Sequence, residues 1–336
     1  MRFGPVPVAE AAGAVLAHAV VLSDGKLKKG RVLSADDVTR LAASGLEQVV
    51  VARMQPGDVG EDAAAARLAA ALVPDPEAAG LRLEAPFTGR VNIRASGPGV
   101  MQLDAGAIAR LNAVDPMITL ATVPEWQRVT EGMMVGTVKI IAYAVGAAAL
   151  DAACAAGAGA MRRLPPTVAS VELIVTETAP GAAGEEDKGV RAVWSRIARL
   201  GLPEGATRIV PHETGAVAAA IAGAGADMVL ILTGSATSDI ADVVPAGLVA
   251  AGGTVTRFGM PVDPGNLLVL GVLDKRPVIG LPGCARSPAL NGADWVLERV
   301  ACGVAVSGPD IAAMGVGGLL KEIPTRPQPR DRAPRG

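Results

Sequence analysis

The feature that most constrains the fold of this chain is a regular alternation of two kinds of segment between residues 166 and 305. Short aliphatic, β-branched runs such as ASVELIVTE, DMVLILTG and RPVIGLPG are typical of buried strands. Between them lie longer segments with the apolar spacing of a helix, for example KGVRAVWSRIARLG. This alternation predicts an α/β fold with helices on a doubly wound, mostly parallel sheet.

The rest of the chain has other sequence patterns, which predict three further segments. Residues 1–84 are interpreted as a small α/β segment, with a helix capped by Ser34 over LSADDVTRLAASG. Residues 85–165 contain short alternating runs such as GTVKIIAYAV, which predict a mainly β middle subdomain with a trailing helix. The α/β domain is assigned to residues 166–306, after the prolines of RRLPPT. Residues 307–336 form a C-terminal extension, and its RPQPRDRAPRG tail predicts partial disorder.

The composition excludes several classes of protein. A formal net charge of -2 on 336 residues argues against a nucleic-acid groove, which needs clustered basic charge. The apolar stretch IIAYAVGAAAL is shorter than the about 20 residues that cross a bilayer. No signal peptide is recognised, and the cysteines 154, 284 and 302 lack metal-ligand spacing. We therefore expect a cytoplasmic protein that binds neither nucleic acid nor membrane, and we also expect a homo-oligomer.

Polar, glycine-containing loops are predicted at one edge of the sheet. Ligands of doubly wound sheets bind beyond the carboxyl ends of the strands. In this sequence the predicted strands end in Thr176-Glu177, Thr233-Gly234-Ser235 and Pro282-Gly283. A further turn at the same edge is forced by Pro264-Gly265. The sequence therefore predicts a ligand site built from these loops.

The first loop combines a predicted anion site with two carboxylates. Backbone N–H groups at Thr233-Gly234-Ser235 precede a predicted helix start, where unpaired N–H groups and the helix dipole favour anions. Asp239 and Asp242 are expected three residues apart in the first turns of that helix. Such a pair above a bound phosphate indicates Mg²⁺, with Asp242 as its ligand. For Asp239, the ordinary preference of acids for a helix N-terminus is an equally good explanation.

The second loop, GLPGCARS, is a strand-to-helix connection of the same kind. Gly283 permits close approach of a ligand to the backbone, Ser287 can cap the next helix, and Arg286 could face a phosphate. The alternative is a tight connection with a solvated arginine. We expect Cys284 to be a packed thiol and His212 a loop or capping residue rather than a general base.

Together the loops resemble the molybdopterin-binding domain shared by molybdopterin adenylyltransferases and molybdopterin molybdotransferases. TGSATSDIAD, PGNLLVLG and GLPGCARS match that family's T/S-G-G, P-G-K-P and G-L-P-G-N-P motifs in order and in spacing. The resemblance covers about residues 166–305. KKGRVLSADDVTRLAASGLEQVVVA also resembles the molybdotransferase segment before this domain. The middle segment resembles a bacterial branch in which some relatives are fused to a nucleotidyltransferase.

The resemblance implies roles for particular residues. Asp242 aligns with the acid that ends the first motif, and Asp239 is the second catalytic candidate. The implied contacts to molybdopterin are Thr233, Gly234, Ser235, Thr237, Gly280, Pro282, Gly283, Arg286, Ser287, Glu177, Pro264 and Gly265. The sequence departs from the family at Ser235, at Asn266 for the lysine of P-G-K-P, and at Cys284 for an asparagine. Loss of the lysine weakens attraction for an oxyanion such as molybdate.

Three functions remain open. The leading hypothesis is a molybdotransferase-type enzyme of molybdenum cofactor biosynthesis, which cleaves adenylated molybdopterin with Mg²⁺ and inserts molybdate. The alternative, favoured by Asn266 and Cys284, is a non-catalytic carrier that passes molybdopterin to a nucleotidyltransferase or a molybdoenzyme. A weaker alternative is a molybdopterin adenylyltransferase, against which the long segment before residue 166 counts.

Overall fold

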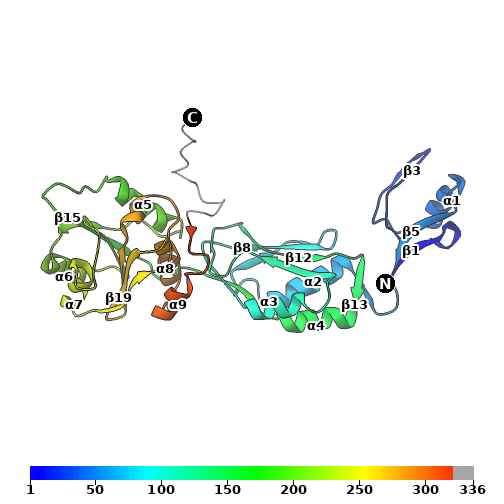
Figure 1. Cartoon of the computed structure of the whole chain (residues 1–336). Coiled ribbons are helices and arrows are strands. Elements are labelled where there is room, and N and C mark those ends of the chain that lie inside the picture. The colour runs from blue at the N-terminus through cyan, green and yellow to red at the C-terminus, as the bar shows by residue number, and fades with distance from the viewer. Residues whose placement is uncertain (321–336) are drawn as a thin grey trace, which may run out of the picture. The chain divides into compact units, whose positions relative to one another are not determined.

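The computed structural model describes residues 1–320, and the tail RPQPRDRAPRG therefore lies outside the described residues. The chain divides into two compact units. The first contains residues 1–97 and 101–163, and the second contains residues 98–100 and the chain from residue 164 onward (Figure 1). Among the described residues, no helix combines the length and the apolar character needed to cross a membrane.

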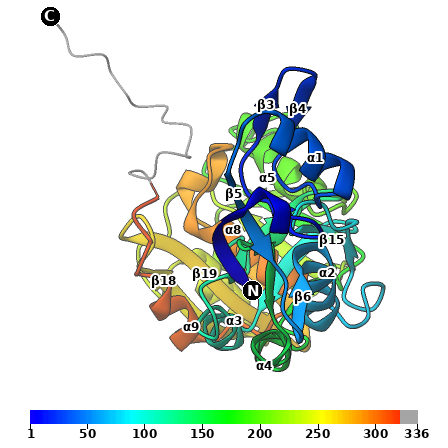
Figure 2. The ribbon, with the colours of Figure 1, turned by 90° about the vertical axis from the view of Figure 1, so that its right-hand side faces the viewer.

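The first unit begins with a small antiparallel sheet and one helix. The sheet has the order β1-β5-β2, with a separate β3-β4 hairpin. The bounds are β1 (Arg2–Pro7), η1 (Val8–Glu10), β2 (Val15–Leu16), β3 (Val20–Leu22), β4 (Gly25–Leu27), α1 (Ala35–Ala43) and β5 (Gln48–Arg53). The predicted cap of α1 is confirmed, because the side chains of Ser34 and Asp37 form a reciprocal capping box. Arg40 of α1 bonds to Asp24 in the hairpin turn, beside which α1 lies in Figure 2.

The remainder of the first unit has a larger core that joins helices to β-sheet. Its four-stranded sheet has the order β10-β12-β8-β7, and α2 packs against β8 and β12. The bounds are β6 (Asp58–Gly60), α2 (Glu61–Leu72), β7 (Leu81–Leu83), β8 (Arg90–Ala95), β9 (Gly99–Leu103), α3 (Ala105–Asn112), β10 (Ile118–Thr122), β11 (Arg128–Val129), β12 (Met134–Ile140), β13 (Ala144–Gly146), α4 (Ala147–Gly157) and β14 (Met161–Leu164). The core runs from Ala64 to Met161. Helix α2 therefore shares a core with the middle segment, although we had placed it before the boundary at residue 85.

The second unit contains the predicted doubly wound sheet. Six strands lie in the order β16-β15-β17-β20-β19-β18; the pairs among β16, β15, β17 and β20 are parallel, and β19 is antiparallel to both β20 and β18. The bounds are β15 (Val171–Glu177), α5 (Lys188–Ala198), β16 (Thr207–Pro211), α6 (Thr214–Ala222), β17 (Met228–Leu232), α7 (Val243–Ala250), β18 (Thr254–Met260), β19 (Asn266–Leu273), β20 (Arg276–Leu281), η2 (Gly283–Arg286), α8 (Gly292–Ala301) and α9 (Gly308–Ala313). The predicted α/β class with a mostly parallel sheet is confirmed.

The helices of this unit cover both faces of the sheet. The connection from β15 to β16 runs in one direction along the sheet, and the connection from β16 to β17 runs in the other. Because such crossovers are right-handed, α5 and α6 lie on opposite faces. Helices α6 and α7 share a hydrophobic core with one face, and α5 and α8 lie away from them in Figure 1. The chain thus leaves β15 and β17 toward opposite faces, so their carboxyl ends form the topological switch point at which such sheets bind ligands.

Candidate functional site

The predicted loops lie at this switch point. Strands β15, β17 and β20 are parallel neighbours, so their carboxyl ends lie at one edge of the sheet. The turn at Pro264-Gly265 joins β18 to the antiparallel β19 and lies at the same edge. We call residues 176–187, 233–242, 262–266 and 282–291 the loop cluster. The edge placement expected for all four segments is therefore present.

The first loop is held against the end of β15 by its glycine. The N–H of Gly234 donates to Oγ1 of Thr176 at 2.8 Å. A Cβ atom added at Gly234 would lie 2.6 Å from the carbonyl oxygen of Thr176. Gly234 therefore has a structural reason to be glycine, because only a residue without Cβ permits this approach of two backbones. Its role as a ligand cradle stays a prediction.

Replacing Gly234 with alanine is expected to destabilise the second unit by about 1–3 kcal/mol, as overpacking typically does. The added Cβ meets backbone, which cannot rotate away. Urea unfolding followed by circular dichroism measures the effect. Gly283→Ala is the matched control, because a Cβ there meets no atom within 4 Å. Equal stability of the two variants would contradict the close approach.

The two aspartates of the first loop occupy positions different from those expected. Helix α7 begins at Val243, so Asp239 lies in the preceding loop and Asp242 is the N-cap. Asp242 Oδ1 accepts from the N–H of Val243 at 2.7 Å, and Oδ2 accepts from the N–H of Ser238 at 2.8 Å. Asp239 Oδ1 accepts from the N–H of Ala241. The residue placed at the helix N-terminus for an ordinary structural reason is therefore Asp242, and not Asp239 as we expected.

The capping bonds keep the Asp242 carboxylate ionised. The hydrogen bonds from Ser238 and Val243 lower the pKa of Asp242 below its ordinary value of 3.8. A carboxylate offers about four acceptor positions, so two capping bonds leave it able to bind a cation. Between residues 1 and 320, no three His, Cys, Asp or Glu side chains gather as metal ligands. The expected Mg²⁺ site needs only one or two carboxylates, so it stays a prediction.

Arg286 connects different loops of the cluster, and Glu177 closes the loop that follows β15. Arg286 Nη2 donates to the carbonyl oxygen of Thr233 at 2.8 Å, and Nη1 lies 3.4 Å from Oδ1 of Asp187. Glu177 Oε2 accepts from the N–H groups of Gly181 and Ala183, at 2.9 and 3.3 Å. Arg286 thus links the loops after β15, β17 and β20. We had expected this guanidinium to face a phosphate; in the structure it bonds to protein oxygens.

The second loop places its glycines in two different environments. Gly280 lies inside β20, where a Cβ would be 3.0 Å from side-chain atoms of Val244 and Val269. It therefore permits α7 to pack closely on the sheet. Gly283 begins η2 after Pro282, and the space around its missing side chain is open. Of the two glycines, Gly283 is the one that leaves room for a ligand.

Two expectations about this loop are wrong. Ser287 does not cap α8; the helix begins at Gly292, and its cap is Asn291, in a capping box with Asp294. Cys284 is exposed rather than packed. Desolvation raises the pKa of the Cys284 thiol, and the negative charge of Asp263 adds to this, so the thiol is protonated at neutral pH.

A buried arginine that we did not predict organises the second loop. Arg196 of α5 forms a buried ion pair with Asp294 through Nε. Its Nη1 donates to the carbonyl oxygens of Ala192 and Ala285, and its Nη2 donates to those of Ser287 and Ala289. Three of these five hydrogen bonds go to carbonyl oxygens of residues 285–289 and fix the course of that segment. The sequence does contain a signal for this buried arginine. Arg196 lies three positions after Val193, so it falls on the apolar face of an amphipathic helix, where a charged residue is unusual.

Buried amides lie in the same part of the cluster. Asn266, which stands where the related family has lysine, is 5% exposed, and neither of its amide atoms has a partner among the described residues. The Nδ2 atom of Asn291 is also buried without a partner there. Such groups call for a ligand or an ordered water, because an unsatisfied buried polar group is costly. Of the first loop, Thr233 and Thr237 are buried and Ser235 is exposed.

His212, which we expected to be a loop or capping residue, contacts the loop cluster. It follows β16 directly, and its Nδ1 atom lies 2.8 Å from Oγ1 of Thr176. The backbone N–H of His212 also donates to the carbonyl oxygen of Glu177 at 2.8 Å. The sequence signal was a polar residue after a predicted parallel strand, the same signal that identified the other loops.

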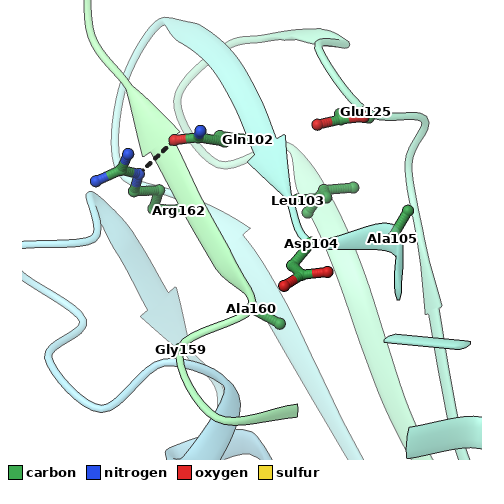
Figure 3. A pocket seen from close by; sticks show the side chains of 8 residues that line it. All are labelled: Gln102, Leu103, Asp104, Ala105, Glu125, Gly159, Ala160 and Arg162. Carbon is green, nitrogen blue, oxygen red and sulfur yellow. Dashed lines mark hydrogen bonds between the residues drawn. The ribbon is translucent and has the colours of Figure 1, made fainter. Parts of the chain in front are cut away.

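The first unit carries a separate hollow of about 470 Å³. Its charged and polar lining includes Gln102, Asp104, Glu125 and Arg162 (Figure 3). Arg162 bonds to Gln102 through Nε, and Asp104 caps α3 by accepting from the N–H of Ala107. None of the predicted site residues lines this hollow.

Comparisons with known proteins give one family match and distant structural neighbours. The family described as Domain of unknown function (DUF8806) matches residues 5–53. No curated protein matches this chain. A molybdopterin biosynthesis MoeA protein from Pyrococcus horikosii is 16% identical, with a TM-score of 0.32, over 90% of this chain and 75% of that one. A molybdenum cofactor biosynthesis protein from Pyrococcus furiosus is 13% identical, with a TM-score of 0.20, over 85% and 59%.

Proposed function

We propose that this protein binds molybdopterin or adenylated molybdopterin in the loop cluster and acts as a molybdotransferase-type enzyme of molybdenum cofactor biosynthesis. One observation carries the proposal. The three motifs that resemble the molybdopterin-binding domain are spread over residues 233–287, and they converge at the edge where the chain leaves β15 and β17 toward opposite faces of the sheet. Ligands of such sheets bind at this point.

The cluster's chemistry suits such a ligand. The open backbone at Gly283 and the exposed Ser235 offer polar groups to the terminal phosphate. The partnerless amide of Asn266 offers donors and an acceptor, which match the edge of a pterin. These features support a phosphorylated heterocycle as ligand.

In the proposed reaction, Mg²⁺ is held at the first loop and molybdate is a substrate. The ionised Asp242, beside Asp239, would hold Mg²⁺ together with phosphate oxygens of the ligand. A cation there neutralises charge on the phosphoanhydride. Molybdate is the second substrate, received by the dithiolene. Asp242 itself orders the loop through its capping bonds and supplies the negative charge.

The carrier remains the second candidate, and a specific observation favours it. The two arginines that contact these loops are bonded within the protein: Arg196 of α5 to Asp294 and carbonyl groups, and Arg286 to Asp187 and Thr233. Asn266 also lacks the positive charge of the family's lysine. The loop cluster therefore directs less positive charge at an oxyanion such as molybdate than the related family does. The carrier would deliver its cargo to a nucleotidyltransferase or a molybdoenzyme, and the adenylyltransferase is a weaker third candidate.

Incubation of the purified protein with adenylated molybdopterin, Mg²⁺ and molybdate tests the proposal. AMP release and metal incorporation are followed, with Mg²⁺ and molybdate omitted in turn. AMP release that depends on both, with metal incorporation, supports the molybdotransferase. Binding without cleavage supports the carrier. Absence of binding contradicts both.

Gly283→Val is expected to keep the fold and to weaken ligand binding at least about tenfold, which corresponds to about 1.4 kcal/mol. The side chain enters open space, so it blocks a ligand without disturbing the protein. Binding of molybdopterin by fluorescence titration measures the effect. Gly225→Val is the matched control, because a Cβ at Gly225 also meets no atom within 4 Å and this residue precedes β17, at the opposite edge. Equal affinity in the two variants would rule out the second loop as a binding surface.

A further inference from the structure

The position of the His212 imidazole is fixed by a fully buried hydroxyl. Thr176, near the end of β15, is 0% exposed. Its Oγ1 lies 2.8 Å from His212 Nδ1 and also accepts the N–H of Gly234 at 2.8 Å. One side chain thus joins the ends of β15 and β16 to the first loop of the cluster.

One tautomer of His212 satisfies every group in this arrangement. The N–H of Gly234 can only donate, so it occupies a lone pair of the Thr176 hydroxyl. The hydroxyl proton is then free to donate to Nδ1, which leaves the proton of the neutral imidazole on Nε2. When the imidazole is protonated, Nδ1–H donates to the remaining lone pair of the hydroxyl. The contact therefore survives in both charge states.

The Nε2–H group is directed away from Thr176. The two nitrogens lie on opposite sides of the ring, and His212 is only partly buried. The acidic groups near it are Asp242, whose oxygens accept two backbone N–H groups, Glu177, which closes its own loop, and the exposed Glu213. Arg286 is paired with Asp187. The Nε2–H group of the imidazole is thus available as a donor to a ligand.

We propose that His212 binds an anionic oxygen of the phosphate type through Nε2–H, and that this binding strengthens when the imidazole is protonated. Thr176 is the positioning residue. The inference rests on the proposed function, because it assumes that the ligand of the loop cluster carries a phosphate. It adds a residue that none of the motifs contains. The sign follows from charge, because a protonated imidazole attracts an anion more strongly than a neutral imidazole does.

Nitrogen-15 NMR of histidine-labelled protein tests this directly, because the chain has only two histidines. The probe is sulfate, which remains a dianion throughout the pH range used, at constant ionic strength. We expect His212 in the Nε2–H tautomer at pH 8 and saturable shifts of its resonances with sulfate at pH 6. The dissociation constant should rise at least about fivefold from pH 6 to pH 8.

Three variants make the test specific. His212→Gln retains an N–H donor that does not titrate, so sulfate binding should lose its pH dependence. His18→Gln removes the other histidine and should leave that dependence unchanged. Thr176→Ser keeps the hydroxyl and should keep the tautomer.

Several outcomes would overturn the inference. These are an Nδ1–H tautomer, a pH dependence that survives His212→Gln, and shifts that are equal at both histidines and do not saturate, which would indicate an adventitious ion only. Binding of molybdopterin without sulfate-dependent shifts would contradict the role of His212 alone. Sulfate-dependent shifts without binding of molybdopterin would contradict the proposed function alone.

Discussion

Replacing Arg196 with methionine is expected to lower the free energy of unfolding by about 3–5 kcal/mol, the range found when one partner of a buried ion pair is removed. The change leaves Asp294 buried without its counterion. It also removes the donors to the carbonyl groups of Ala285, Ser287 and Ala289. Urea unfolding followed by circular dichroism measures the loss.

The same helix provides the control. Arg191 of α5 has a side chain 61% exposed and pairs with the exposed Glu186. Arg191→Met should therefore cost at most about 1 kcal/mol, as exposed ion pairs do. Adding Asp294→Asn to Arg196→Met removes the unpaired charge and keeps an acceptor for the α8 cap, so part of the stability should return. If Arg196→Met and Arg191→Met are equally stable, Arg196 does not organise the second loop.

Asp242→Asn is expected to reduce AMP release by about a hundredfold, a loss typical when a group that stabilises developing charge is removed. Asparagine is a good N-cap, so α7 should form. In the variant, the amide nitrogen takes the place of Oδ2 and cannot accept the N–H of Ser238. Loss of this hydrogen bond should cost about 1 kcal/mol of stability. Asp239→Asn, which removes charge from the loop without touching the cap of α7, is the matched control and should have a smaller effect on AMP release.

The stability part of this prediction depends on pH. The folded pKa of Asp242 lies below its ordinary value of 3.8, so its contribution is present above that value. It is lost as the pH falls through the folded pKa. The difference in stability between the wild type and Asp242→Asn should therefore be present at pH 7 and shrink in strong acid. Full AMP release by Asp242→Asn would exclude the metal role, and no release by the wild type would favour the carrier.

The sequence by itself determined the architecture of the second unit and the edge at which its loops lie. Strand and helix periodicities are local properties, and they appear clearly between residues 166 and 305. Once parallel strands alternate with helices, the carboxyl ends of the strands must share an edge. That is why Thr233-Gly234-Ser235, Pro264-Gly265 and Pro282-Gly283 could be grouped without any coordinates.

Element boundaries were less predictable. From the sequence, Asp239 and Asp242 were both expected in the first turns of one helix, and Ser287 was expected to cap the next; Ser, Asp and Asn are all good N-caps. Tertiary packing selected Asp242 and Asn291. Likewise, Ala64 to Met161 form one core although the composition changes near residue 85, because α2 packs on strands that follow it in the chain.

Only the tertiary structure decided what individual side chains of the site do. Gly234 and Gly283 look alike in sequence, but one contacts a backbone 58 residues away and the other faces open space. Arg196 finds its carbonyl and carboxylate partners mostly about 90 residues along the chain, and His212 finds Thr176 36 residues away. The physical reason is that sterics and hydrogen bonds act over a few ångströms in space. Separation along the chain carries no information about them until the sheet is assembled.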